Sequence, residues 1–241
     1  MRNVLLIARR ELAAYLTTPM GYVIVGAVLL ADGLLFNWFV LGGEPKPSTL
    51  VLEGFFRIAS GTTMIAAIPL SMRLLAEDRQ TGAIVLLQTS PIREVEIVLG
   101  KYLSAVAFLG TMTLLSVYMP LLVMVNGRVS GGHILAGYGG LLLLGGAALA
   151  VGLFGSALSR SQVVAAISSA LMLMLLVLMW MGARVSSPPL DRLFEYLALH
   201  NKHFLPFEQG IVGLSHFVYY GSVIFFFLLA ATKVLEARRW R

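Results

Sequence analysis

The sequence predicts an all-α integral membrane protein with six transmembrane helices, a helix in the membrane interface at the N-terminus, and a cytoplasmic helix between the second and third spans. Hydrophobic residues make up 58% of the 241 residues, and charged residues only 12%, about half their share in soluble domains. Apolar stretches long enough to cross a bilayer recur along the chain. A soluble fold of this size could not bury so much apolar surface, whereas a bilayer solvates it.

The first element expected is a helix within Met1–Thr18. Its apolar residues fall on one helical stripe, with Arg2 and Arg10 away from it and Arg9 at its flank, which is typical of a helix lying flat in the interface. The stripe consists of Leu5, Ala8, Leu12, Tyr15 and Leu16.

Six spans follow, and together they form the single membrane domain that we expect over residues 1–241. The predicted spans are 21–41, 56–75, 102–125, 134–157, 163–183 and 217–232. The fourth is rich in glycine, and its ridge of Ala148, Gly152 and Ser156 favours close helix packing within the subunit. The loop between the last two spans holds apolar patches too short to span, which we expect to form re-entrant or interfacial helices.

Basic residues set the expected orientation. With the N-terminus inside, twelve Lys and Arg residues fall in or beside cytoplasmic segments and six in or beside external ones. This two-to-one bias predicts that both termini are cytoplasmic. It also accounts for the net charge of +6, so we expect no nucleic-acid partner.

The sequence lacks the motifs of several catalytic sites. There is no P-loop, because the Gly100-Lys101 pair is followed by Tyr102 and no glycine stands at the upstream position. There is no cysteine for thiolate chemistry. His200 and His203 are three residues apart, but no third metal ligand is evident. We therefore predict no catalytic residue, no metal site and no cofactor in this chain.

Asp32 is the one charged residue of the first span. A carboxylate within a span usually faces a bundle interior or a wet cavity. Two roles are open for it: a group on a substrate or proton path, or a structural partner for a neighbouring helix.

The most polar stretch between spans covers residues 77–101. A charged start leads into a short helix that presents Ile84, Leu86 and Leu87. Ser90-Pro91 then has the pattern of an N-cap followed by proline at the first helical position, and predicts a second helix running through Arg93 into the third span. The first helix either docks on a soluble partner or is a plain interfacial loop.

Three segments resemble one family. The run Glu77-Asp78-Arg79-Gln80-Thr81-Gly82, continued by Leu86-Leu87, Ser90-Pro91-Ile92 and Gly100-Lys101-Tyr102, is similar to the pattern after the second helix of ABC-2 type permeases. Arg10-Glu11-Leu12, Tyr15 and Thr18-Pro19 resemble the same family's elbow helix. The C-terminal segment from His203-Phe204 to Leu235-Glu236-Ala237-Arg238-Arg239-Trp240 is similar to the gliding-motility-associated branch.

The resemblance implies a permease subunit of an exporter in the bacterial inner membrane, paired with a second copy or a paralogue. Two separate ATPase subunits would bind ATP and Mg, and a periplasmic or membrane accessory protein is a further expected partner. The implied contact with the ATPase consists of Glu77, Asp78, Arg79, Thr81, Gly82, Leu86, Leu87, Ser90 and Pro91. The implied elbow residues are Arg9, Arg10, Glu11 and Tyr15, and the implied outer gate loop contains His203, Phe204, Phe207 and Gly210.

Two other functions remain as alternatives. One is an ion-coupled secondary transporter that uses Asp32 as its coupling carboxylate, although no second buried acid or inverted repeat supports it. The other is a non-transporting scaffold that transmits ATPase force to periplasmic partners.

Overall fold

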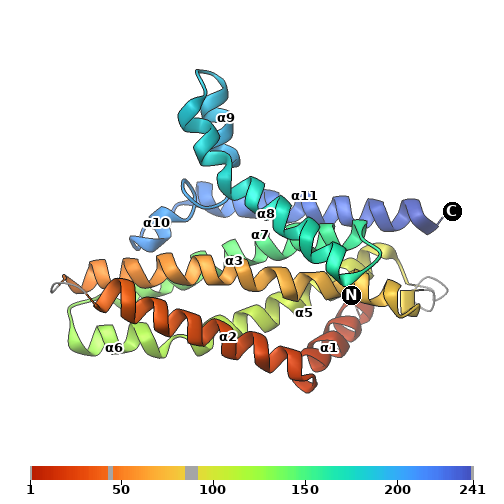
Figure 1. The fold of residues 1–241 in the computed structure, drawn as a ribbon, viewed down its shortest axis with the longest axis horizontal. Coiled ribbons are helices and arrows are strands. Elements are labelled where there is room, and N and C mark those ends of the chain that lie inside the picture. The colour runs from red at the N-terminus through yellow and green to blue at the C-terminus, as the bar shows by residue number, and fades with distance from the viewer. Residues whose placement is uncertain (1, 43–45, 85–91, 240–241) are drawn as a thin grey trace.

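The computed structural model of the chain describes residues 2–42, 46–84 and 92–239. Its regular elements are helical throughout these ranges (Figure 1). They are α1 (Arg2–Thr17), α2 (Pro19–Leu35), η1 (Phe36–Leu41), α3 (Ser48–Gln80), α5 (Glu94–Leu115), α6 (Tyr118–Asn126), α7 (Gly131–Leu158), α8 (Gln162–Val185), α9 (Leu190–Leu197), α10 (Leu205–Glu208) and α11 (Leu214–Arg239).

Six helices are long and apolar enough to cross a membrane, which confirms the predicted number. They cover Pro19–Leu41, Ser48–Gln80, Glu94–Asn126, Gly131–Leu158, Gln162–Val185 and Leu214–Ala237. Each predicted span lies within one of them. The second extends well beyond the predicted 56–75, because Arg57 and Arg73 lie inside the helix and pair there with Glu208 and Glu77.

Helix α7 is the centre of the bundle and packs against α3, α5, α8 and α11. Its glycines permit this close approach. A Cβ on Gly137 would lie 2.2 Å from the Phe56 ring, and one on Gly152 would lie 2.0 Å from Ser71 Oγ. The expected small-residue ridge therefore serves packing within the chain.

Two spans depart from a regular α-helix. The first span ends in the π-helix η1, and the third span is broken at Ser116 and Val117, between α5 and α6. The start of α5 also corrects a prediction. Ile92 and Arg93 are not helical and α5 begins at Glu94, so the predicted helix does not run through Arg93 into the third span. The Glu96 side chain instead accepts the Arg93 backbone N–H at 3.2 Å, which fixes the helix start.

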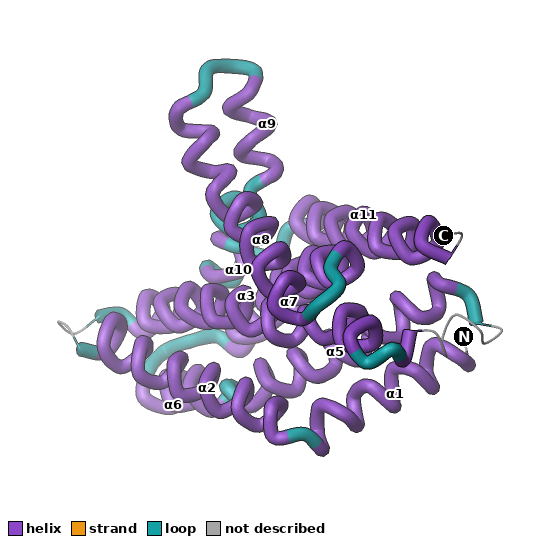
Figure 2. Tube along the Cα trace, turned by 45° about the vertical axis from the view of Figure 1, so that its right-hand side comes forward, coloured by secondary structure: helices purple, strands orange, loops and turns teal. Residues whose placement is uncertain are grey.

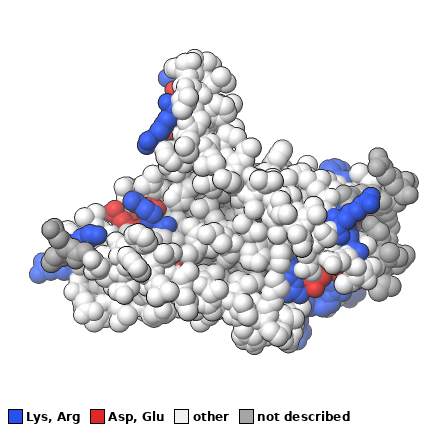
Figure 3. Space-filling model, viewed as in Figure 1, with Lys and Arg blue, Asp and Glu red and all other residues white. Residues whose placement is uncertain are grey.

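Both termini lie at the same end of the bundle, as Figures 1 and 2 agree. We call this the termini end and the other the opposite end. A hairpin made of the last part of α8 and α9 stands out from the side of the bundle. On the face shown in Figure 3, charged side chains gather at the two ends and on this hairpin, leaving the middle uncharged, as expected for a surface in contact with lipid.

Candidate functional site

The termini end contains a buried ionic cluster centred on Lys101, near the start of α5. Its side chain is only 1% exposed, and its Nζ lies 2.7 Å from Asp78 Oδ2 and 3.0 Å from Glu11 Oε1. Asp78 belongs to the end of α3 and Glu11 to α1. We call these three residues the lysine hub, because one cation joins three helices.

Helix α1 is held to the bundle by the hub and by Tyr15. Burial raises the pKa of Glu11, but Lys101 and Arg10 outweigh burial and bring this pKa below its ordinary value. The Tyr15 hydroxyl donates to the Leu70 carbonyl at 2.8 Å, and burial raises its pKa. Of the four predicted elbow residues, Glu11 and Tyr15 therefore face the bundle, whereas Arg9 and Arg10 are exposed.

The predicted ATPase contact begins at the end of α3. Asp78 points into the hub, and Arg79 donates to the Ala157 carbonyl and to the Ser159 carbonyl, the latter at 2.7 Å. These two side chains therefore tie the segment to α5 and to the end of α7.

Three other predicted contact residues lie nearer the surface. Glu77 is half-buried and pairs with Arg73 at 2.7 Å, and Thr81 is exposed and caps the helix by donating to the Glu77 carbonyl. Gly82 has φ of +77°, a left-handed conformation that favours glycine. The remaining predicted residues, Leu86, Leu87, Ser90 and Pro91, lie outside the described residues.

Ser156 joins α7 to α3 just before this segment. Its hydroxyl accepts the backbone N–H groups of Leu75 and Ala76 at 3.1 and 2.9 Å and donates to the Met72 carbonyl at 3.0 Å. A side chain is thereby inserted into the backbone ladder of α3. The end of α3 is therefore bonded to α7 both through Ser156 and through Arg79.

Asp32 lies inside the bundle, as expected for an intramembrane carboxylate. Its side chain is buried, and Oδ1 accepts the Thr62 hydroxyl of α3 at 2.6 Å. This bond joins the first and second spans.

The predicted outer gate residues lie together at the opposite end. The His203 ring stacks on Tyr219 with centroids 3.6 Å apart. His203 Nε2 donates to the Tyr196 carbonyl at 3.2 Å, so Nδ1 accepts from His216 Nδ1, also at 3.2 Å. Burial lowers the pKa of His203 to about 4. Phe204 is fully buried beside it.

The other two outer gate residues pack on α7. Phe207 is fully buried, and a Cβ on Gly140 would lie 2.6 Å from the Phe207 Cβ. Gly210 has φ of +78° and lies against the His133 ring. The part of the loop that carries Phe207 and Gly210 is therefore packed on the bundle, unlike α9, which projects from it.

Glu208 forms a second cluster at this end, which the sequence did not predict. Its side chain is 1% exposed and lies 3.4 Å from Arg57 and 4.0 Å from His200. Burial raises the pKa of Glu208 in spite of Arg57 and lowers the pKa of His200. Ser60 bonds His200 at 2.7 Å, and the His133 ring bonds the Glu208 carbonyl.

Lys101 and Glu208 are the main residues that the sequence interpretation missed. Lys101 stands 90 residues from Glu11, so sequence spacing gives no sign of their pairing. A lysine at the edge of a predicted span, close to an acidic segment, is the one signal that was present. Within the described ranges, no group of three or more His, Cys, Asp or Glu side chains is placed to hold a metal ion.

The geometry defines a polytopic helical membrane protein whose buried polar groups link helices. The model of the ABC-2 family transporter proteins matches residues 14–236, and the chain belongs to this family. It is thus an ABC-2 family transporter membrane component. A comparison with curated proteins finds no match.

Proposed function

We propose that this chain is the permease subunit of an ABC-type exporter whose ATP hydrolysis takes place in a separate pair of ATPase subunits. A second permease, identical or a paralogue, completes the complex. The chain's own part is mechanical: it receives movement from the ATPases at the termini end and converts it into movement of the spans. The family match supports the transporter class, and the lysine hub supports the mechanical role.

The lysine hub is the observation that carries this proposal. The proposed coupling helix, residues 77–91, begins within the end of α3, where Asp78 and Arg79 attach it to the bundle. Asp78 forms an ion pair with Lys101, which also pairs with Glu11. Arg79 donates hydrogen bonds to carbonyl groups at the end of α7. A displacement of this segment is therefore passed to α1, α5 and α7 together, because a buried charge cannot leave its partners without a large loss of free energy.

The proposed orientation places the termini end in the cytoplasm. The twelve-to-six distribution of basic residues supports it, and Figures 1 and 2 show both termini at one end. ATP and Mg then bind to the partner on that side. Helix α1 is in this proposal the elbow helix at the inner surface.

The loop that carries His203 and Phe207 is the proposed external gate. Its side chains pack on α7 and α11. A movement of these spans would therefore change the surface against which the loop packs. The bond from Asp32 to Thr62 favours a structural role for this carboxylate over ion coupling. We also propose that the chain belongs to the gliding-motility-associated branch of the family, and this assignment rests on the C-terminal motif alone.

The proposal is tested by capture of a co-expressed ABC-type ATPase subunit in mild detergent. Thr81 is exposed at the termini end, so Thr81→Arg adds bulk and charge to the proposed contact without disturbing the hub. We expect the wild-type chain to retain one ATPase subunit for each permease subunit, and the Thr81→Arg variant to lose most of the bound ATPase. Arg128→Glu, a change at a residue that is also exposed but lies at the opposite end, is the control and should retain it. Failure of the wild-type chain to capture the ATPase contradicts the proposal.

A further inference from the structure

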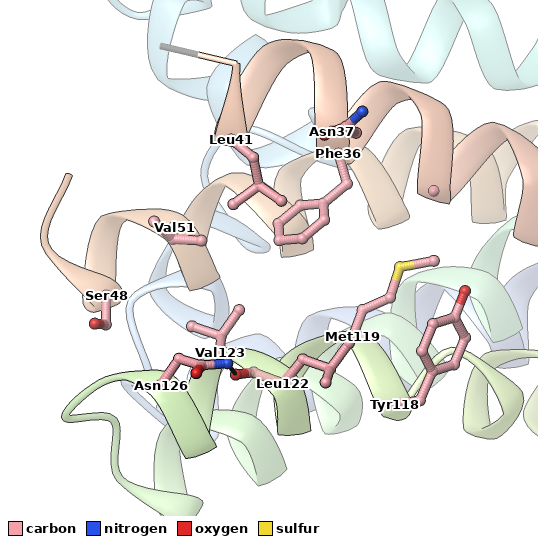
Figure 4. Close-up of a pocket in the computed structure, with 11 residues that line it drawn as sticks. Phe36, Asn37, Leu41, Ser48, Val51, Tyr118, Met119, Leu122, Val123 and Asn126 are labelled. Carbon is pink, nitrogen blue, oxygen red and sulfur yellow. Dashed lines mark hydrogen bonds between the residues drawn. The ribbon is translucent and has the colours of Figure 1, made fainter. Parts of the chain in front are cut away.

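A groove of about 430 Å³ opens on the side of the bundle between the first and third spans. Its floor consists of Phe36 and Met119, which are 7% and 5% exposed, and its rim includes Leu41 and Leu122, which are 52% and 44% exposed. Figure 4 shows Phe36 and Leu41 facing Met119 and Leu122 across the open space. This gradient of exposure means that the groove opens sideways, and its volume suits a small-molecule site.

The walls of the groove are the two irregular parts of the spans. One wall is η1, and π-helical turns within α-helices occur frequently at functional sites. The other wall is α6, which follows the break at Ser116 and Val117. The Ser116 hydroxyl bonds the Tyr138 hydroxyl at 3.0 Å, so this break is anchored to α7. The groove is thus formed by departures from regular helix geometry on both sides.

Two basic residues lie close in the sequence to the polar limit of the groove. Ser48 and Asn126 line the groove where α3 begins and α6 ends. Lys46 and Arg128 stand two residues beyond them, and both are exposed. Lys46 also lines a separate cavity, together with Glu53 and Arg57.

We propose that the groove binds one acyl chain of an anionic phospholipid from the bilayer leaflet at the opposite end. An acyl chain suits this space because its lining is largely apolar and the bilayer supplies no water at this depth. Basic residues at the groove's limit attract an anionic headgroup. The inference rests on the groove alone and is independent of any ATPase.

The test uses the absence of cysteine from the chain. Leu122→Cys places one thiol on the rim of the groove, and Val125→Cys places one on the same helix at a site that is 81% exposed and outside the groove. Each purified variant is labelled with N-benzylmaleimide after folding and incubated with equal amounts of phosphatidylglycerol and phosphatidylcholine. Bound lipids are counted by native mass spectrometry.

We expect the label at 122 to remove one bound phosphatidylglycerol and the label at 125 to remove none. Equal lipid counts for the two labelled variants overturn the proposed site. A second arm compares wild type with Lys46→Gln and Arg128→Gln, each of which should lower the preference for phosphatidylglycerol about fivefold. Retention of both lipids in equal amounts by wild type overturns the anionic preference.

Discussion

The two ends of the molecule use polar groups in different ways. At the termini end, Lys101 is paired with two carboxylates and Arg79 with two backbone carbonyls. At the opposite end, His203 and Glu208 are buried where their charged forms are disfavoured. Fixed ion pairs hold helices together across the ordinary pH range, whereas groups with shifted pKa values loosen or tighten as the pH changes. This difference fits the roles proposed above, in which the termini end transmits movement and the opposite end forms the external gate.

The largest expected effect is at the lysine hub. Lys101→Met leaves the largely buried carboxylates of Asp78 and Glu11 without their shared cation, and should cost about 3 kcal/mol of unfolding free energy, the lower end of the range for a broken buried pair. Asp78→Asn should cost less, because Lys101 keeps Glu11. Urea unfolding in detergent, followed by circular dichroism, measures both.

A triple variant serves as the control for the hub. Glu11→Leu, Asp78→Leu and Lys101→Met together remove every charge of the cluster, and apolar replacement of a complete buried ionic group is often neutral or stabilising. We expect the triple variant to be more stable than Lys101→Met alone. A triple variant that is less stable would mean that the hub contributes net stability rather than a specific connection.

The next effect concerns the packing of α7. Gly152→Ala places a Cβ 2.0 Å from Ser71 Oγ, and should cost about 1–3 kcal/mol through overpacking. Gly139→Ala on the same helix meets nothing within 4 Å and should be neutral or stabilise the helix by about 0.5–1 kcal/mol. Thermal unfolding in one detergent compares them, and equal losses would contradict the packing account.

The smallest effect is the acid sensitivity of the opposite end. The pKa of His203 in the folded protein, about 4, lies below its ordinary 6.5. The stability contributed by neutral His203 is thus complete above pH 6.5 and is lost as the pH falls toward 4. His200 acts in the same direction, whereas Glu208, with a raised pKa, acts in the opposite one.

Hydrogen exchange at pH 7 and pH 5, corrected for intrinsic rates, measures this sensitivity. Amides of residues 196–210 in wild type should lose protection at pH 5, and His203→Phe should reduce the loss while keeping the stack on Tyr219. Amides around Lys101 are the internal control, because Glu11, with its lowered pKa, stays ionised over this range. Equal losses at both ends would contradict the comparison.

The number and approximate position of the spans could be predicted because hydropathy is a local property of the sequence. The lateral contacts could not. In the sequence, Arg57 lies near the beginning of the second predicted span. Only the fold shows that it pairs with Glu208, 151 residues away. The pattern around Asp78 indicates a polar surface segment, but the side chain points inward and pairs with the buried Lys101.

The two local irregularities differ in this respect. The residues of η1 have no feature that distinguishes a π-helix from an α-helix. The break at Ser116 and Val117 has a cause in the sequence, because Pro120 has no N–H to donate to the Ser116 carbonyl and its ring clashes with that carbonyl. The start of α5 was predicted wrongly because Ser90-Pro91 has a strong capping pattern, while Glu96 and Arg93 provide the actual cap.

The central claim is that the proposed coupling helix meets an ATPase at the termini end. It is tested most directly by cross-linking from a single cysteine, with Thr81→Cys at that end and Arg128→Cys at the opposite end, in membranes that contain a co-expressed ABC-type ATPase subunit. A short bifunctional reagent should join the ATPase to Thr81→Cys in high yield and not to Arg128→Cys. Cross-linking from Arg128→Cys alone would reverse the orientation, and cross-linking from neither would contradict the coupling account.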